Sequence, residues 1–250
     1  MALRVMRVVN GNIEAVAGSG RPGFNGEALP ALEANLGGIV NVAFDQNGAL
    51  LIVDGFNRVR RLDTDGFVRT VAGSARAAAT AGLTCDSGQA TLAALSNPRQ
   101  VTPLRDGSFW IKDLGGRHLR IVTPDGIIRT INTNFETSVN ILLFPDGTPA
   151  AATANRVYRI LSNGNIETGG NSFTPFTGTP LAIGTDSSLY FSGNARPEQR
   201  NPLLKLTGNI QTVVAGAPVA PTVEGQAPPY GIWNPKTGSL LYSASVGEKS

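Results

Sequence analysis

Apolar and polar residues alternate over short stretches of this chain, and each stretch runs into a turn that contains glycine. In RVRRLDTDGFVRTVAG, which begins at Arg58, two such stretches flank an Asp-Gly pair. Alternation with a period of two predicts β-strands, and Asp-Gly or Asn-Gly supplies the positive φ of a tight turn. The segments that share this hairpin pattern begin at Arg4, Arg58, His118, Arg156 and Pro202.

A second kind of hairpin precedes all of these segments except the first. It is clearest in NVAFDQNGALLIVDG from Asn41, QVTPLRDGSFWIKDL from Gln100 and NILLFPDGTPAAATA from Asn140, and a weaker copy starts at Leu181. Two hairpins in series make a four-stranded antiparallel unit. One further copy of this first hairpin begins at Gly231, and no second hairpin follows it.

The two ends of the chain each carry half of such a unit. We therefore predict that about Leu240 to Ser245 pair with about Leu3 to Val9 and complete one sheet. Four-stranded sheets arranged in a closed ring form a β-propeller. The predicted fold is all-β, a five-bladed β-propeller in a single domain over residues 1–250, with the last blade shared between residues 1–18 and 226–250. Six blades and an open solenoid are disfavoured.

Two long connections, Ser19 to Gly38 and Ser74 to Asn97, separate the first units. Both are rich in Ala and Leu, and we expect linkers that contain a short helical turn. They exceed the usual 2 to 6 residues, and long connections are frequent functional loops. Phe24 and Leu83, near the loop tips, are the predicted contacts to a protein partner. The residues expected to fill gaps between blades are Leu32, Leu36, Leu92 and Leu95.

Composition and charge exclude several classes of protein. The chain has 21 Lys and Arg residues against 18 Asp and Glu, so its net charge of +3 does not demand a nucleic acid partner. Cys85 is the only cysteine, which excludes an intrachain disulfide. The N-terminus lacks the apolar core of a secretory signal, and no apolar run reaches the roughly 18 residues of a membrane span. We expect synthesis in the cytoplasm without a signal peptide, and no membrane insertion.

Few residues are suited to catalysis or metal binding. His118 is the only histidine, which excludes a histidine triad and a site with two histidine ligands; it aligns with arginines of other units and is interpreted as a surface position. In the first strands of the units only Asp45 can ionise, so no metal or cofactor is predicted. Asp54 and Asp113 close second strands, and we expect Asp54 to accept backbone N–H bonds of the following turn.

The basic and aromatic residues do not form an obvious binding surface. Strand alternation would divide the basic residues between the two faces of the sheets, which does not favour nucleic acid. Trp110 and Trp233 align with core positions, and the tyrosines fall at places that differ between units, which argues against one sugar pocket per blade. The basic residues concerned are Arg58, Arg60, Arg61, Arg69, Arg117, Arg120 and Arg129.

The segments VAGSGRPGFNGEALPALEANLGG, VAFDQNGALLIVDGFNRVRRLD and GFVRTVAG resemble the NHL-repeat family of propellers. The resemblance covers about residues 11–132 and weakens afterwards, where later units lose the aspartate and then the arginine of the motif. It implies the propeller fold. It also implies that lyases and metal-dependent hydrolases among such proteins draw their ligands from strands near the central channel. The corresponding strands of this chain lack converging carboxylates.

We therefore predict a non-catalytic binding or scaffold propeller, not an enzyme, that works with protein partners in a larger assembly. A self-closing ring without a catalytic set and without a signal peptide suggests a phage virion part, such as a capsid or tail accessory protein. No small-molecule ligand is indicated. Two alternatives stay open: a propeller lyase or hydrolase whose site the sequence does not reveal, and a carbohydrate- or RNA-binding module.

Overall fold

Nearly all regular structure in the computed structural model is β-strand, which confirms the all-β class. Among the described residues the one helix is a 3-10 turn, Ala90–Leu92, in the second long linker. No helix in this part of the chain has the length and apolar character that a membrane span requires. The structure describes residues 3–74, 85–113, 118–131, 140–161, 165–167, 176, 178–193, 202–208 and 210–215, and the backbone of residues 230–234 and 239–243.

Two antiparallel sheets contain five strands each. In both, a short strand from the preceding linker pairs with the outermost of four consecutive strands. The predicted four strands per blade are one too few here, because the linker backbone runs alongside the outer edge. The first sheet consists of β3 (Leu29–Pro30), β4 (Asn41–Phe44), β5 (Leu50–Asp54), β6 (Arg58–Leu62) and β7 (Phe67–Ala72). The second consists of β8 (Gly88–Gln89), β9 (Pro98–Pro103), β10 (Phe109–Asp113), β11 (His118–Val122) and β12 (Ile127–Ile131).

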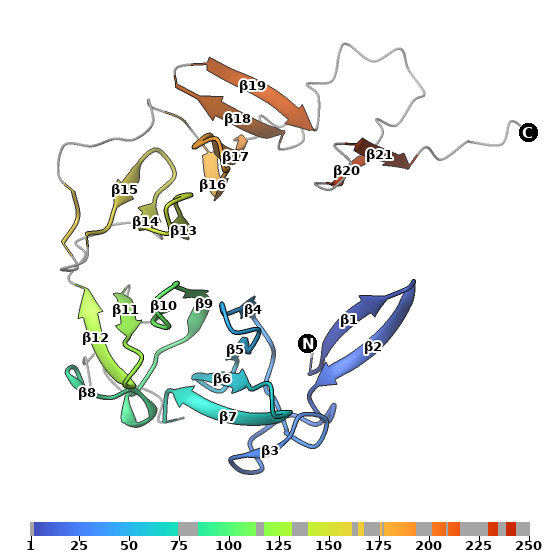
Figure 1. Ribbon diagram of the computed structural model, residues 1–250, viewed down its shortest axis with the longest axis vertical. Coiled ribbons are helices and arrows are strands. Elements are labelled where there is room, and N and C mark those ends of the chain that lie inside the picture. The colour runs from blue at the N-terminus through green and yellow to red at the C-terminus, as the bar shows by residue number, and fades with distance from the viewer. Residues whose placement is uncertain are drawn as a thin grey trace, which may run out of the picture.

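The remaining strands form a three-stranded sheet, a four-stranded sheet and two hairpins. The sheets follow one another around an arc, and their first strands, β4, β9, β13 and β16, contact one another in turn (Figure 1). We call these four the inner strands. The third sheet consists of β13 (Asn140–Leu143), β14 (Pro149–Ala152) and β15 (Val157–Arg159). The fourth consists of β16 (Gly178–Ile183), β17 (Leu189–Gly193), β18 (Leu203–Thr207) and β19 (Ile210–Ala215).

The hairpins at the two ends of the chain do not pair with each other in this structure. β1 (Val5–Val9) pairs with β2 (Asn12–Ala17), and β20 (Tyr230–Asn234) pairs with β21 (Ser239–Ser243). The two hairpins are separate sheets that lie apart in the arc, so the predicted closing pair is not formed (Figure 1). Each hairpin needs only a local turn, whereas closure joins opposite ends of the chain and carries the larger entropy cost.

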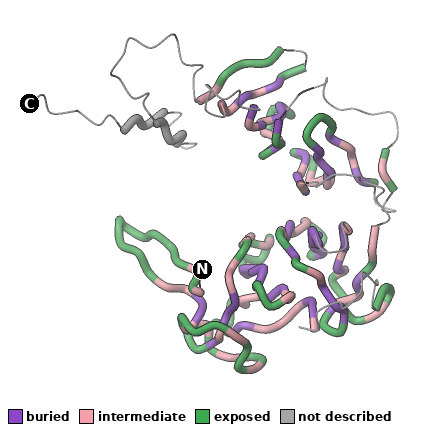
Figure 2. The backbone as a smooth tube through the Cα atoms, turned by 180° about the vertical axis from the view of Figure 1, so that it is seen from behind, coloured by how far each residue is buried: buried purple, intermediate pink, exposed green. Residues whose placement is uncertain are grey.

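Many residues on the strands of neighbouring sheets are buried (Figure 2), and the apolar ones form clusters between the sheets. Val53 and Ile111 belong to one cluster between the first and second sheets. Trp110 and Ile141 belong to another between the second and third sheets, and Phe191 to a third between the third and fourth sheets. The β1–β2 hairpin is mostly exposed, because no sheet packs on both of its faces (Figure 2).

Four linker leucines were predicted to fill gaps between sheets, and two of them are buried. Leu36 and Leu95 are fully buried, as predicted. Leu32 and Leu92 are 54% and 62% exposed, so that part of the prediction is wrong. Alanines in the same linker turns take the inward positions instead, because they join the buried clusters on either side.

The glycine that ends the repeated Val-Ala-Gly motif is required by a backbone contact. Gly73 has a φ of 89°, and a Cβ built on it would lie 2.2 Å from the carbonyl oxygen of Asn57. Gly18, in the equivalent place, has a φ of 97° and would bring a Cβ within 2.3 Å of the Leu3 carbonyl oxygen. The turn residue Gly126 has a φ of 79° but open space around it.

We expect Gly73→Ala to destabilise the protein more than Gly126→Ala. Both changes place a Cβ in the left-handed region, at about 1–2 kcal/mol. Only Gly73→Ala also overlaps backbone atoms, which should add about 2 kcal/mol or more to the loss in the free energy of unfolding. Urea titration of both variants measures this difference, and equal losses would show that the contact is not needed.

We also keep the prediction of closure, because β1 and β21 each leave one edge unpaired and unpaired edges favour pairing. Removing the chain from Gly238 onward should then lower the midpoint and the cooperativity of thermal unfolding. Removing only residues 246–250, which follow the predicted closing pair, should change neither. A protein truncated at Gly238 that melts like the full chain would rule out closure.

Candidate functional site

Side-chain amides near the start of the inner strands connect each sheet to the next. The side-chain oxygen of Asn41 accepts a hydrogen bond from a backbone N–H of β9 at 2.9 Å. Gln100 donates from Nε2 to the carbonyl oxygen of Ile141 at 2.8 Å and accepts from the Ile141 N–H at 3.2 Å. Asn140 donates from Nδ2 to a backbone carbonyl of β16 at 3.0 Å. We call these three side chains the amide ties.

Lys112 lies beside the amide ties. It stands opposite Gln100 in the β9–β10 pair, so the two side chains share the face toward the third sheet. Its Nζ donates to the side-chain oxygen of Asn140 at 3.0 Å, and the residue is only 8% exposed. No carboxylate of the described residues forms an ion pair with it. Burial therefore lowers the pKa of Lys112 below its usual 10.5, which favours the neutral amine.

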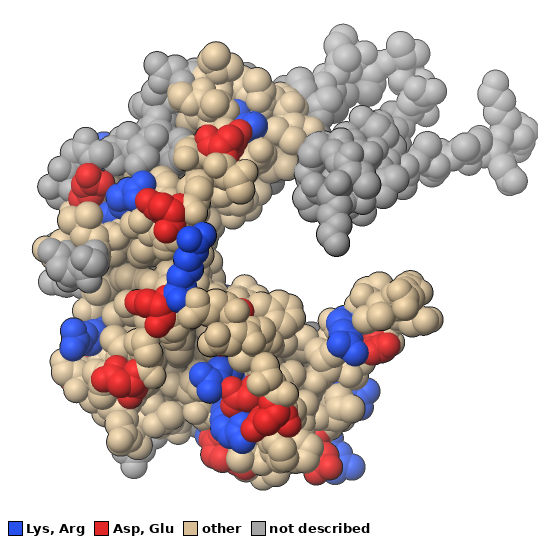
Figure 3. Space-filling view, viewed as in Figure 1, with Lys and Arg blue, Asp and Glu red and all other residues tan. Residues whose placement is uncertain are grey.

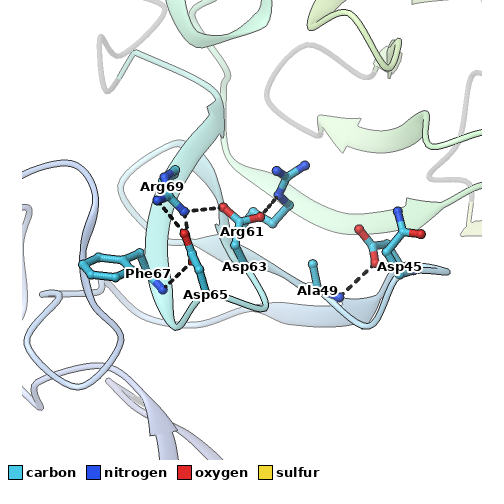
Figure 4. A network of polar contacts seen from close by, with 8 residues as sticks. Asp45, Ala49, Arg61, Asp63, Asp65, Phe67 and Arg69 are labelled. Atoms are coloured by element: carbon cyan, nitrogen blue, oxygen red, sulfur yellow. Dashed lines mark hydrogen bonds and ion pairs between the residues drawn. The ribbon is translucent and has the colours of Figure 1, made fainter.

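The inner strands do not offer a metal site among the residues that the structure describes. Asp45 follows β4, and its carboxylate accepts a turn N–H from Ala49 (Figure 4). Sequence reasoning missed Arg99, because β9 begins two residues earlier than expected. No three His, Cys, Asp or Glu side chains of the described residues gather around one point. A divalent ion needs several oxygen ligands, and the amide ties with the cations Lys112 and Arg99 do not fit one.

Asp54 and Asp113 hold the linkers, and Asp54 also accepts a bond from the following turn, as predicted. Asp54 accepts N–H bonds from Phe56 in the following turn at 3.1 Å and from Gly37 in the linker at 2.8 Å. Both carboxylate oxygens of Asp113 accept the N–H of Ser96, at 2.8 and 3.0 Å. Burial raises the pKa of Asp113 to about 6, against the opposing effect of the Ser96 N–H.

His118 lies on the third consecutive strand of its sheet and not among the inner strands. It stands opposite Asp113, as Arg58 stands opposite Asp54 in the first sheet, which agrees with its alignment to arginines. The side chain is half-buried. Burial, and then the charge of Arg120, lower the pKa of His118 below 6.5, so the ring is neutral at pH 7.

The basic residues of the sequence do not form one surface. Arg60 and Arg120 are buried, and their guanidinium groups reach Glu27 and Asp86 of the linkers at 3.8 and 3.0 Å. Arg69 pairs with two aspartates of its own hairpin turn (Figure 4). Figure 3 shows positive and negative atoms next to each other on this face rather than a broad positive field. Strand alternation thus divides the predicted cluster, as expected.

Of the two predicted partner contacts, the structure describes Phe24, and its role in partner binding stays a prediction. Its ring is 41% exposed, and the guanidinium of Arg58 lies 3.9 Å from the ring centre, so one face of the ring packs on the propeller itself. Trp110 is in the core, as predicted, and Cys85 is exposed. The residues of these predictions that lie outside the described side chains are Leu83, Arg117 and Trp233.

No family model and no curated protein matches the sequence. Solved structures do match. A virginiamycin B lyase from Staphylococcus aureus, determined with quinupristin in a catalytically inactive histidine-to-alanine form, is 16% identical with a TM-score of 0.52, over 89% of this chain and 74% of that chain. A streptogramin B lyase is 17% identical with a TM-score of 0.50, over 86% and 63%. A gluconolactonase from Xanthomonas campestris is 14% identical with a TM-score of 0.56, over 96% and 75%.

The fold is that of a β-propeller. This confirms the predicted fold class, while the blade number stays a prediction. The prediction of a non-catalytic scaffold, with its assignment to a virion, is contradicted, because these propellers are named as lyases and as a lactonase. The sequence argument looked for histidines and carboxylates and did not consider a buried lysine. The chain spans less than two thirds of the length of the streptogramin B lyase.

We expect Asp113→Asn to flatten the pH dependence of stability. The pKa of Asp113 in the folded protein, about 6, lies above its usual value of 3.8. The folded state therefore holds the extra proton between these values, and the free energy of unfolding should fall by about 1–3 kcal/mol as the pH rises from 4 to 7. Asparagine keeps an acceptor for the Ser96 N–H and carries no charge.

Urea unfolding at several pH values between 4 and 7 measures this slope. Asp146→Asn is the matched control, because the Thr148 N–H and Arg159 lower the pKa of Asp146 to about 2, below the range tested. The control should keep the slope of the unchanged protein. If Asp113→Asn keeps it too, Asp113 does not bind the proton.

Proposed function

We propose that this chain is a catalytic propeller, a lyase or hydrolase that cleaves an ester bond, with Lys112 as its base. The observation that carries the proposal is a buried amine beside the amide ties, with no carboxylate partner among the described residues. The matching lyases and lactonase support a catalytic propeller as the class. A lactonase opens a cyclic ester, and this suggests the type of bond.

The environment of Lys112 suits a general base. One N–H of the amine points to Asn140, which is itself held by a backbone carbonyl of β16, so the nitrogen has a fixed orientation. A lysine whose pKa is lowered by burial loses its proton at a lower pH than an exposed lysine does, which suits a general base. The small part of its surface that stays exposed is where a substrate would approach.

Two reactions use such a base. In hydrolysis, the amine takes a proton from water, the water oxygen attacks the ester carbonyl, and the departing alkoxide receives that proton from the ammonium group. In elimination, the amine takes a proton from carbon, a carbon–carbon double bond forms, and the ester C–O bond breaks to release a carboxylate. Both return Lys112 to the neutral form once the proton is passed on.

Arg99 adds positive charge near the start of the inner strand β9. It is exposed on β9, directly before Gln100, and it has no ion pair among the described residues. A guanidinium group binds a carboxylate through two N–H donors, and it stabilises negative charge that develops on a carbonyl oxygen. In this proposal Arg99 attracts a negatively charged substrate to this end of the inner strands, and Lys112 moves the proton.

We also propose that the first two sheets are NHL-type repeats. In each sheet, a buried arginine of the third consecutive strand and a threonine of the fourth reach the same acidic residue of the linker. This repeated contact supports a shared linker design in addition to the sequence pattern. The equivalent residues are Glu27, Arg60 and Thr70 in the first sheet, and Asp86, Arg120 and Thr130 in the second.

We expect the purified chain to cleave gluconolactone or quinupristin, and the activity to depend on Lys112. Lys112→Met removes the amine, and Lys112→Arg keeps a positive charge that cannot be lost near neutral pH. Both should lower kcat by about a hundredfold or more, the range for removing a general base. In the unchanged protein the rate should rise with pH, through a pKa below 10.5, because the neutral amine is the active form.

His118→Ala is the matched control, since a histidine is essential in one of the lyases and His118 is the only histidine here. It should keep activity within a few-fold. Loss of activity in this variant, with full activity in Lys112→Met, would contradict the proposed base. Failure to cleave either substrate would contradict the enzymatic function. Product mass separates the reactions, because hydrolysis adds one water and elimination does not.

A further inference from the structure

A cleft of about 670 Å³ lies between the second and third sheets. It is at the end of these sheets where the hairpin turns β9–β10, β11–β12 and β13–β14 gather. Its walls are largely apolar and include Ile121 and Ile131 from the second sheet and Ile160 from the third. Charged side chains of the turns and outer strands stand around it.

Trp110 lines this cleft with an unused hydrogen-bond donor. The residue is 2% exposed, and its Nε1 has no acceptor among the described residues. A buried indole N–H usually has a partner, because losing its bond to water without replacement is unfavourable. Because Nε1 itself is enclosed, the ring must turn slightly before an oxygen atom of a molecule bound in the cleft can supply that partner.

The arginines of the cleft leave positive charge available. Arg159 is neutralised by Asp146 at 2.9 Å and packs over the ring of Phe144. Arg129 is exposed on β12 and forms no ion pair with a described residue. Arg105 makes only a long contact, 3.4 Å, to a backbone carbonyl.

The cleft is lined by three arginines and two aspartates, so a net positive charge remains. Asp106 accepts both the backbone N–H and the hydroxyl of Ser108, within its own turn. Arg105 and Arg129 therefore stand near an apolar cleft without a carboxylate partner. Guanidinium groups bind planar carboxylates through paired N–H donors, most strongly where apolar walls exclude water.

We propose that this cleft binds a small organic carboxylate with an apolar body and an additional oxygen acceptor. The carboxylate is held by Arg105 and Arg129, the apolar body packs against the isoleucines and the indole ring, and the additional oxygen accepts the Trp110 N–H. This site is separate from Lys112, and the proposal does not depend on the enzymatic function above.

N-Benzoylglycine is a suitable probe, because it combines a carboxylate, an amide oxygen and a phenyl ring. We expect it to bind with a Kd below about 1 mM by calorimetry, and more weakly as salt is added, since salt screens the charge interaction. The indole N–H signal of Trp110 is assigned in ¹H–¹⁵N spectra as the one that is missing from the Trp110→Phe variant. The probe should shift this signal. Arg129→Gln should weaken binding about tenfold, and Trp110→Phe several-fold.

Three controls test the specificity of this site. Arg7→Gln, which changes an exposed arginine of the β1–β2 hairpin, should bind the probe like the unchanged protein, and thermal melts should show that all variants are folded. The site would be overturned if the neutral N-benzoylglycinamide bound as tightly as N-benzoylglycine. It would also be overturned if Arg7→Gln and Arg129→Gln lost the same affinity for the probe. Tighter binding of phenyl phosphate would overturn its assignment to carboxylates. An unchanged Trp110 indole signal would overturn the contact to that residue.

Discussion

Each inner strand is connected to the next by one side-chain amide, and the placing of the sheets around the arc depends on this contact. Gln100 shows why the constraint is strict: it satisfies both the N–H and the carbonyl of one residue on the neighbouring strand. Apolar packing alone would let two sheets slide past each other, because the hydrophobic effect has no direction. The amide bonds require one register, and they bring Asn140 within reach of Lys112.

The linkers are held by a second kind of contact, in which buried charges meet backbone groups. Asp113 accepts the linker N–H of Ser96, and Arg120 reaches Asp86, which lies earlier in the same linker. Removing charges from water is costly unless they are paired and hydrogen-bonded. The linker therefore cannot leave without exposing unpaired charges in the core, which explains why it lies along the edge of the sheet as a fifth strand and is not a free loop.

The sequence predicted the hairpins and the class of fold well, because turn glycines and alternation are local signals. The positive φ of Gly66 and Gly126 follows from Asp-Gly pairs that can be read directly. Contacts between segments far apart in the chain were not predictable in this way. Burial of Arg60, whose guanidinium faces a linker acid more than thirty residues earlier, has no local signature in the sequence. Lys112 was missed for the same reason, since in the sequence it is one polar residue in a strand.

The second sheet differs from the first at two positions of β10, and this difference is the strongest reason to place function between the second and third sheets. In the first sheet, Leu51 and Val53 occupy the positions equivalent to Trp110 and Lys112, and both pack in an apolar cluster against the next sheet. The fold is thus satisfied by two apolar residues there. The second sheet instead places a lysine with a lowered pKa and an indole with an unpaired N–H on the same face of β10. Both substitutions cost stability in a packed interface, and neither is required by the architecture, so a chemical role is the explanation that accounts for both.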